Sequence, residues 1–370
     1  MDQPLQEKIA GKPRILVAPL DWGLGHATRC IPIIKELLNQ DCEVWLAGEG
    51  TQEALLKTEF PQLPFLRLPG YRVHYAKSAM GLLQNMFYQT PKILRAIKNE
   101  NNWLKEKMKE YEFDSIISDN RYGLYYKDVP CIFITHQLSI KSPLGKWSER
   151  ILQKRNYRYI NRFTECWIPD EEGKNNLAGE LSHPGAIPKT SLRYLGSLSR
   201  FSSHSQNETK GHLLIILSGP EPQRSIFENI IVKEIAHYNG TATIVRGLPN
   251  SISLIPSTNS ILFYNHLSVE LLNQEMEKAE FVIARCGYST VMDLVKLQKK
   301  NILIPTPGQT EQKYLSKYLS GKKIAFCADQ KKFSLESSLI KAKNFSYEFP
   351  LISHNDKFKV AIENFLRSLK

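Results

Sequence analysis

The chain has 370 residues, of which 42% are hydrophobic, and a formal net charge of +12. This length and apolar content suffice for two globular domains and exclude a disordered or fibrous chain. No apolar stretch reaches the roughly 18 residues of a spanning helix, no signal-peptide core stands at the start, and the six cysteines form no C-x-x-C pair. We therefore expect a protein of the reducing cytoplasm, with an anionic partner such as a nucleotide, a phospholipid surface or a nucleic acid.

Short apolar runs alternate with longer helical patterns along the first half of the chain. Such alternation predicts βαβ units and therefore a parallel sheet. Helices are predicted at 29–40 and 51–58, and strands at 15–19, 43–47, 65–68, 115–118, 131–135 and 165–169.

Residues 182–207 are rich in serine, proline and glycine, and 202–207 lose hydrophobic periodicity, which predicts a domain boundary. The alternation then restarts. Strands are predicted at 212–217, 242–245, 261–263, 281–284, 301–304 and 324–327. The predicted fold class is α/β, with two Rossmann-like domains at 1–200 and 201–355 whose parallel sheets face each other across a cleft. Residues 356–370 carry one apolar helical face and are predicted to pack back on the N-terminal domain as a closing helix.

A glycine turn, Gly23-Leu-Gly-His-Ala-Thr-Arg29, follows the first predicted strand. Gly23 and Gly25 leave backbone N–H groups free where a helix should begin, which suits an anion or a developing negative charge. A dinucleotide fingerprint with Glu49 as the ribose acid is one interpretation, but Thr28 holds the third glycine position. His26 is either a turn cap or a general base, because imidazole titrates near neutral pH.

Three motifs together resemble the two-domain GT-B glycosyltransferases. They are the glycine turn, Ala-Arg-Cys-Gly-Tyr-Ser-Thr at 284–290 and Pro-Thr-Pro-Gly-Gln-Thr-Glu-Gln at 305–312. The branch most similar is glycosyltransferase family 28, which includes the enzyme that adds N-acetylglucosamine to the lipid-linked peptidoglycan precursor. The resemblance covers almost the whole chain. It implies a nucleotide diphosphate sugar bound by the C-terminal domain and an acceptor bound by the N-terminal domain.

The same resemblance implies a set of donor-binding residues. Ser218 and Gly219 would lie near the diphosphate or the sugar, and Arg200 would neutralise the charge of the leaving group. Tyr264 would lie beside a uracil base, and Asp293 would accept hydrogen bonds from the ribose. The other implied donor residues are Arg285, Gly287, Ser289, Glu311 and Gln312. Each role has a structural alternative. Ser218 and Gly219 would form an ordinary βα turn, Arg200 would be a solvated linker arginine, and Asp293 would be a solvated aspartate on a helix.

On the acceptor side, polar residues follow two predicted strands. His136 and Gln137 follow 131–135, where the family carries a similar run, and Asp119 follows 115–118. Asp119 is expected to orient His26 or to bind acceptor hydroxyls. His136 is expected to contact a substrate, although a histidine at a strand end is more often structural. Gly23 and Gly25 complete the acceptor-side prediction.

Residues 76–98 mix apolar side chains with Lys77, Lys92, Arg95 and Lys98. This composition is typical of an interfacial helix on anionic lipid, so peripheral contact with the inner face of the cell membrane is one expectation. The other, which the pattern favours, is a helix whose apolar face packs in the domain core.

The expected function is inverting, metal-independent transfer of a sugar from a nucleotide diphosphate donor, a UDP-sugar, to an acceptor hydroxyl that is lipid-linked in the family's peptidoglycan enzyme. His26 would remove the acceptor proton. The resemblance implies transfer without a metal, in agreement with the lack of an Asp-x-Asp pair at a strand end, and no cofactor is expected. The alternatives are a nucleotide-sugar 2-epimerase or hydrolase on the same fold, an NAD-dependent oxidoreductase, and a non-catalytic nucleotide or nucleic-acid binder. Dispersed basic residues argue against nucleic acid.

Overall fold

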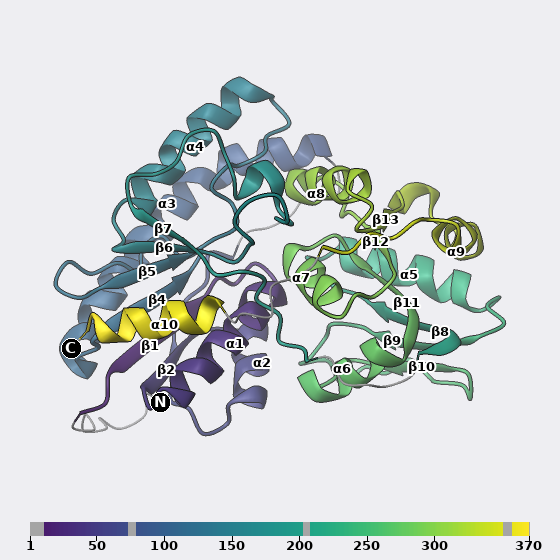
Figure 1. Cartoon of the computed structure of the whole chain (residues 1–370), viewed down its shortest axis with the longest axis horizontal. Helices are drawn as coiled ribbons and strands as arrows, with labels where there is room; N and C mark the ends of the chain where they lie inside the picture. Colours follow the sequence, from purple (N-terminus) through teal and green to yellow (C-terminus); the bar gives the residue numbers. More distant parts are fainter. Residues whose placement is uncertain (1–10, 73–78, 203–207, 351–356, 370) are drawn as a thin grey trace. The chain divides into compact units, whose positions relative to one another are not determined.

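The computed structural model describes residues 11–72, 79–202, 208–350 and 357–369, without the side chains of 79–89. The chain divides into two compact units. The first comprises Met1–Val73, Met86–Leu198 and Ser353–Lys370, and the second comprises His74–Asn85 and Ser199–Ile352. Most of the predicted boundary stretch 202–207 lies outside the described residues. Figure 1 gives the course of the chain.

The first unit is built on a parallel sheet of seven strands in the order β3-β2-β1-β4-β5-β6-β7. Its strands are β1 (Arg14–Pro19), β2 (Glu43–Gly48), β3 (Phe65–Arg67), β4 (Ser115–Asp119), β5 (Cys131–Ile134), β6 (Glu165–Ile168) and β7 (Ser191–Tyr194). Every residue of β1 and β4 is buried, as expected for parallel strands covered on both faces. The order reverses between β1 and β4, and the carboxyl ends of strands at such a switch point are where open α/β sheets bind ligands.

The first unit contains α1 (Leu24–Asn39), α2 (Thr51–Glu59), α4 (Lys146–Ile160), α10 (Lys357–Arg367) and a 3-10 turn η1 at Gly179–Leu181. It also contains α3 (Ala79–Tyr111) from Met86 onward, since the residues before Met86 are assigned to the second unit. Figure 1 shows α10, in yellow, beside α1, which it contacts together with β7. Ala361, Ile362 and Phe365 are buried there, and the Phe365 ring meets the Trp167 ring edge to face at 5.6 Å.

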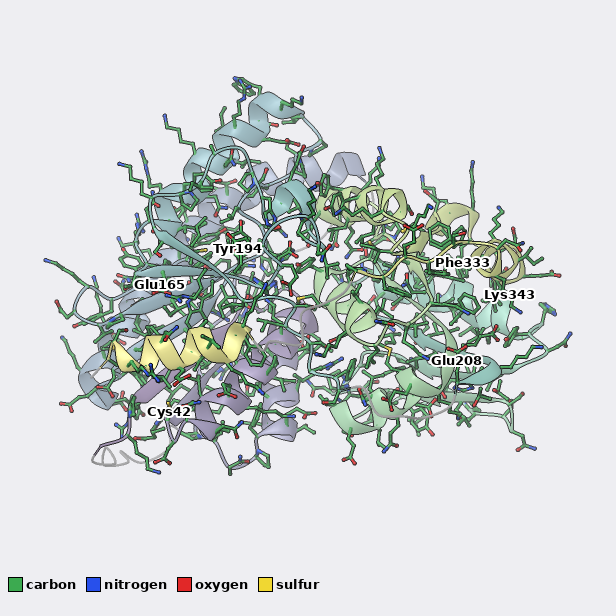
Figure 2. The ribbon with its side chains drawn as sticks, viewed as in Figure 1. Cys42, Glu165, Tyr194, Glu208, Phe333 and Lys343 are labelled. Carbon is green, nitrogen blue, oxygen red and sulfur yellow. The ribbon has the colours of Figure 1, made fainter. Side chains whose placement is uncertain are left out.

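The second unit is built on a parallel sheet of six strands in the order β10-β9-β8-β11-β12-β13. Its strands are β8 (Thr209–Ile216), β9 (Thr241–Val245), β10 (Ile261–Tyr264), β11 (Ala279–Arg285), β12 (Asn301–Ile304) and β13 (Phe326–Cys327). Its helices are α5 (Gln223–Ile235), α6 (Val269–Lys278), α7 (Tyr288–Lys296), α8 (Thr310–Gly321) and α9 (Leu335–Lys343), with η2 at Gln330–Lys332. The switch point lies between β8 and β11. Figure 2 labels Phe333 in this unit. The ring centres of Phe333 and Phe227 lie 5.8 Å apart, edge to face.

These two parallel sheets confirm the predicted α/β fold class, and the structure corrects three element predictions. β7 was not expected, because residues 182–207 were interpreted as a boundary stretch. It is a half-exposed edge strand, so it lacks the apolar run of a buried strand. Helix α1 begins at Leu24 instead of residue 29, which places His26 in its first turn. The last strand spans only Phe326–Cys327.

Candidate active site

A charged cluster forms in the first unit where α1 meets the carboxyl end of β4. Gly23 has a φ of 95°, a backbone conformation that side chains disfavour, and it turns the chain from β1 into α1. His26 and Arg29 are three residues apart and therefore share a face of α1. That face meets Asp119, the last residue of β4, which pairs in register with Pro19 of β1.

Asp119 is the centre of this cluster. His26 Nδ1 lies 2.7 Å from Asp119 Oδ1, and Arg29 binds both carboxylate oxygens through Nε and Nη2. The Asp119 side chain is fully buried, and Arg29 is 1% exposed, whereas 16% of the His26 side chain is exposed. The bidentate ion pair fixes the carboxylate, and the carboxylate in turn fixes the imidazole.

The electrostatics of the cluster leave His26 neutral. Burial alone would raise the pKa of Asp119, but Arg29 and then His26 outweigh burial and hold this pKa well below its usual range. For His26, burial lowers the pKa and Arg29 lowers it further, and together they exceed the raising effect of Asp119. An unprotonated imidazole beside an ionised carboxylate is able to accept a proton at neutral pH.

His136 and Cys30 also reach the cluster. His136, just beyond β5, is 4% exposed, and its Nδ1 lies 2.9 Å from Arg29 Nη1. The Cys30 thiol donates to Asp119 Oδ2 at 3.6 Å, and burial raises the pKa of that thiol well above its usual value. Sequence reasoning assigned no role to Arg29. The available signal was its position three residues after His26 in a helix.

The other acceptor-side predictions lie around the cluster. The Gly23 carbonyl accepts from Gln52 Nε2 at 3.1 Å, and the Gly25 carbonyl accepts from Thr28 Oγ1 at 3.0 Å. Gln137 is half-buried, and its backbone N–H donates to Thr135 Oγ1 at 3.0 Å.

Glu49, the ribose acid of the dinucleotide alternative, is paired within its own unit. Its two carboxylate oxygens accept from Arg72 Nε and Nη2, each at 2.9 Å. One of them also accepts from the backbone N–H of Gly70 at 2.8 Å.

In the second unit, Asp293 is enclosed by residues that precede β8. Although the helical pattern placed it off the apolar face of α7, it is only 6% exposed. Its carboxylate accepts from Ser199 Oγ at 2.7 Å and lies 3.7 Å from Arg200 Nε. Burial raises the pKa of Asp293 to about 6, against the opposing effect of Arg200. The two predicted donor residues Arg200 and Asp293 therefore contact each other.

Arg285 ends β11 beneath the N-terminus of α5, and no carboxylate of the described residues pairs with it. It is 1% exposed, its guanidinium carbon lies 4.4 Å from the Phe227 ring centre, and its Nη2 donates to the Gln223 carbonyl at 2.8 Å. Its Nε and Nη1 have no hydrogen-bond partner among those same residues. Burial lowers the pKa of Arg285 to about 10, so the group stays cationic at neutral pH.

The turn between β8 and α5 brings further polar groups to this edge of the sheet. Gly219 has a φ of +102°, and a Cβ there would lie 3.8 Å from Thr306 Oγ1. That hydroxyl has no partner in the part of the chain that the structure describes. The Thr306 backbone N–H donates to Gln312 Oε1 at 2.8 Å, so Gln312 holds the loop after β12 in place.

The remaining donor predictions occupy the same sheet edge or the helices beyond it. Tyr264 ends β10 and is 39% exposed. Gly287 caps α7, and Ser289 lies in its first turn. Glu311 lies in the first turn of α8, and Ser218 follows Leu217 in the turn after β8.

The predicted lipid-contact segment 76–98 falls partly on residues that the structure does not describe. Residues 76–78 and the side chains of 79–89 are outside the described part of the chain. Within the described part, Ile93 and Ile97 of α3 pack with Leu20 and Tyr71. No helix of the described residues is long and apolar enough to cross a membrane. The same residues contain no group of three or more His, Cys, Asp or Glu side chains that could hold a metal ion.

Solved structures of similar fold match over nearly the whole chain. The spinosyn rhamnosyltransferase SpnG has a TM-score of 0.59 at 15% identity and covers 96% of both chains. The glycosyltransferase SnogD of Streptomyces nogalater has a TM-score of 0.55 at 14% identity and covers 97% of this chain and 100% of its own. MurG of Acinetobacter baumannii has a TM-score of 0.50 at 13% identity, covering 96% and 95%.

The two parallel sheets and the similar solved structures give the chain the GT-B fold, the fold of the glycosyltransferases that the three sequence motifs resemble. The family model of glycosyl transferase family 1 matches residues 14–350, and the chain belongs to that family. A Methanosarcina mazei protein named "Uncharacterized glycosyltransferase" is 23% identical over 323 residues, which are 81% of each chain. A protein of the same name from Methanosarcina acetivorans is 21% identical over 324 residues, also 81% of each.

Proposed function

We propose that the protein transfers a sugar, with inversion and without a metal, from a UDP-sugar to an acceptor hydroxyl. The second unit, residues 201–355 in the predicted division, would bind the donor. The first unit, residues 1–200 with the closing helix, would bind the acceptor. The observation that carries the proposal is the 2.7 Å contact between His26 Nδ1 and the buried carboxylate of Asp119.

His26 is proposed as the general base. Asp119 orients the ring through Nδ1, which leaves Nε2 to take the proton of the acceptor hydroxyl as its oxygen attacks the anomeric carbon. Attack opposite the leaving group inverts that carbon, and the diphosphate departs with the electron pair of the broken bond. The lowered pKa of His26 supports this role, because the base must be unprotonated before the reaction.

The donor diphosphate is proposed to bind at the switch point of the second sheet. Arg285 is a buried cation, and the first turn of α5 above it carries no acidic residue, so both favour an anion. Gly219 and Ser218 lie in the turn that leads into α5. The nucleotide class is supported by the fold neighbour SpnG, of which a complex with thymidine diphosphate is known.

Asp293 and Arg200 are proposed to exchange partners on donor binding. Asp293 would accept hydrogen bonds from the ribose, and Arg200 would turn to the phosphates that carry the leaving-group charge. Tyr264, Gly287, Ser289, Glu311 and Gln312 would contact the base or the sugar. Reaction in the cytoplasm, and an acceptor presented at a membrane through 76–98, remain parts of the proposal.

The test replaces His26 with alanine. We expect transfer to fall by at least about 100-fold, the usual contribution of a positioned base, with UDP affinity by calorimetry within twofold of wild type. Turnover is measured as nucleotide release from UDP- and TDP-sugars with a panel of glycan and lipid acceptors. Unchanged turnover in the alanine variant would refute the base.

A matched control is His183→Ala, because His183 also stands beside a buried carboxylate, with its Nδ1 3.9 Å from Asp170 Oδ2. This variant should retain transfer. Products formed from the donor alone separate the alternatives: an epimerised donor indicates a 2-epimerase, and free sugar at full rate indicates a hydrolase.

A further inference from the structure

One guanidinium in the first unit contacts two imidazoles. Arg29 Nη1 lies 2.9 Å from His136 Nδ1, and Arg29 Nη2 lies 3.0 Å from His26 Nδ1. A guanidinium has N–H donors and no acceptor, and it keeps its protons throughout the physiological range. Each ring nitrogen that forms a hydrogen bond with Arg29 must therefore present a lone pair.

His136 satisfies this requirement in one tautomer only. Its Nδ1 accepts from Arg29 Nη1, so the ring proton must lie on Nε2. A proton on Nδ1 would set an N–H of His136 against the N–H of Arg29 at 2.9 Å. The contact therefore favours the His136 tautomer whose proton lies on Nε2.

His26 requires the opposite tautomer. Its Nδ1 lies 2.7 Å from Asp119 Oδ1, and an ionised carboxylate only accepts. Nδ1 must therefore carry the proton, which leaves the lone pair on Nε2. The 3.0 Å approach of Arg29 Nη2 then joins two donors. That approach is repulsive, and the repulsion grows if the ring gains a second proton.

We propose that Arg29 is a positioning residue that sets the tautomer of His136, opposite to the one that Asp119 sets in His26, and keeps His26 free of a second proton until an acceptor delivers one. This inference rests on the proposed function, because it explains how the base is held ready. The groups that act on the charge of His26 are Asp119, Arg29 and His136. Burial lowers the pKa of His26 most; among these groups, Asp119 raises it, and Arg29 and then His136 lower it.

The first test needs no substrate. In ¹⁵N NMR spectra of the uniformly labelled full chain at pH 7.5, with His26→Gln and His136→Gln used for assignment, we expect His26 protonated on Nδ1 and His136 on Nε2. A wild-type spectrum with His136 protonated on Nδ1, or with the two rings in the same tautomer, would overturn the proposal.

The second test replaces Arg29 with glutamine. Asp119 then acts on His26 without an opposing cation, so the pKa of His26, followed by NMR titration, should rise by about one unit or more. The acidic limb of the pH–rate profile should move upward by the same amount. An unchanged titration midpoint would contradict the assigned role. Arg29→Lys retains the charge and should shift the midpoint less, which keeps the test usable if the glutamine variant does not fold.

Arg121→Gln is the matched control, because Arg121 is another fully buried arginine of this unit, paired with Glu100 at 2.7 Å. The loss of Arg121 should reduce the stability of the protein and leave the pKa of His26 unchanged. The outcomes also separate the two hypotheses. If the two rings of the wild type have opposite tautomers but the His26→Ala variant is active, only the proposed base is refuted. If the two rings have the same tautomer and the His26→Ala variant is inactive, only the role of Arg29 is refuted.

Discussion

The two units place buried charges at equivalent points of their sheets but compensate them differently. In the first unit, Asp119 at the end of β4 is matched by Arg29 and His26, so the cluster is complete within the protein. In the second unit, Arg285 at the end of β11 lies over the Phe227 ring and donates one hydrogen bond, to a carbonyl, with two nitrogens unpartnered among the described residues. A completed cluster is suited to orienting a catalytic group, whereas an uncompensated cation is suited to receiving an anion.

The largest expected effect comes from breaking the completed cluster with Asp119→Asn. The variant leaves Arg29 buried without its counterion, which should destabilise the protein by about 3–5 kcal/mol, and transfer should fall at least about 100-fold as His26 loses its partner. Urea unfolding and turnover measure the two effects. Asp170→Asn is the control, because Asp170 is also fully buried but accepts from the backbone N–H groups of Leu177 and Ala178. It should lose stability and keep activity.

Asp293 gives an intermediate effect with a defined pH dependence. Its folded pKa of about 6 exceeds the usual 3.8, so the folded state binds the extra proton and loses stability as the pH rises from 4 to 6. Above pH 6 the loss is roughly 3 kcal/mol at most, since each pKa unit is worth about 1.4 kcal/mol. Asp293→Asn should therefore be more stable than wild type at pH 8 and similar at pH 3.5. Superimposable stability profiles of the two proteins would contradict this expectation.

The smallest expected effect concerns the uncompensated cation. Arg285→Gln should weaken UDP binding by about 10-fold, the usual order for one charge-assisted contact, while stability stays equal or rises because a buried charge is removed. Thermal shifts with and without UDP measure both. Arg246→Gln is the control, because Arg246 Nε pairs with Glu228 at 2.6 Å, so its loss should lower stability and leave UDP binding unchanged. Equal UDP shifts for wild type and Arg285→Gln would remove Arg285 from the donor site.

The sequence predicts the sheets well because the inner parallel strands carry continuous apolar runs, such as 15–19 and 302–304. It misses β7, an edge strand with half-exposed residues. It places Asp119 at a strand end but cannot supply the 2.7 Å contact with His26, since 93 residues separate them. The burial of Asp293 is equally hidden, because the residues that enclose it, Ser199 and Arg200, lie far away along the chain.

Helix α10 has a consequence for biosynthesis. It belongs to the first unit, where it buries Ala361, Ile362 and Phe365, yet it follows the whole of Ser199–Ile352 in the chain. A ribosome therefore translates the whole of the second unit before it translates the helix that covers α1 and β7. The nascent first unit stays uncovered on that side during elongation, and a stop codon ahead of residue 357 would leave this apolar surface bare.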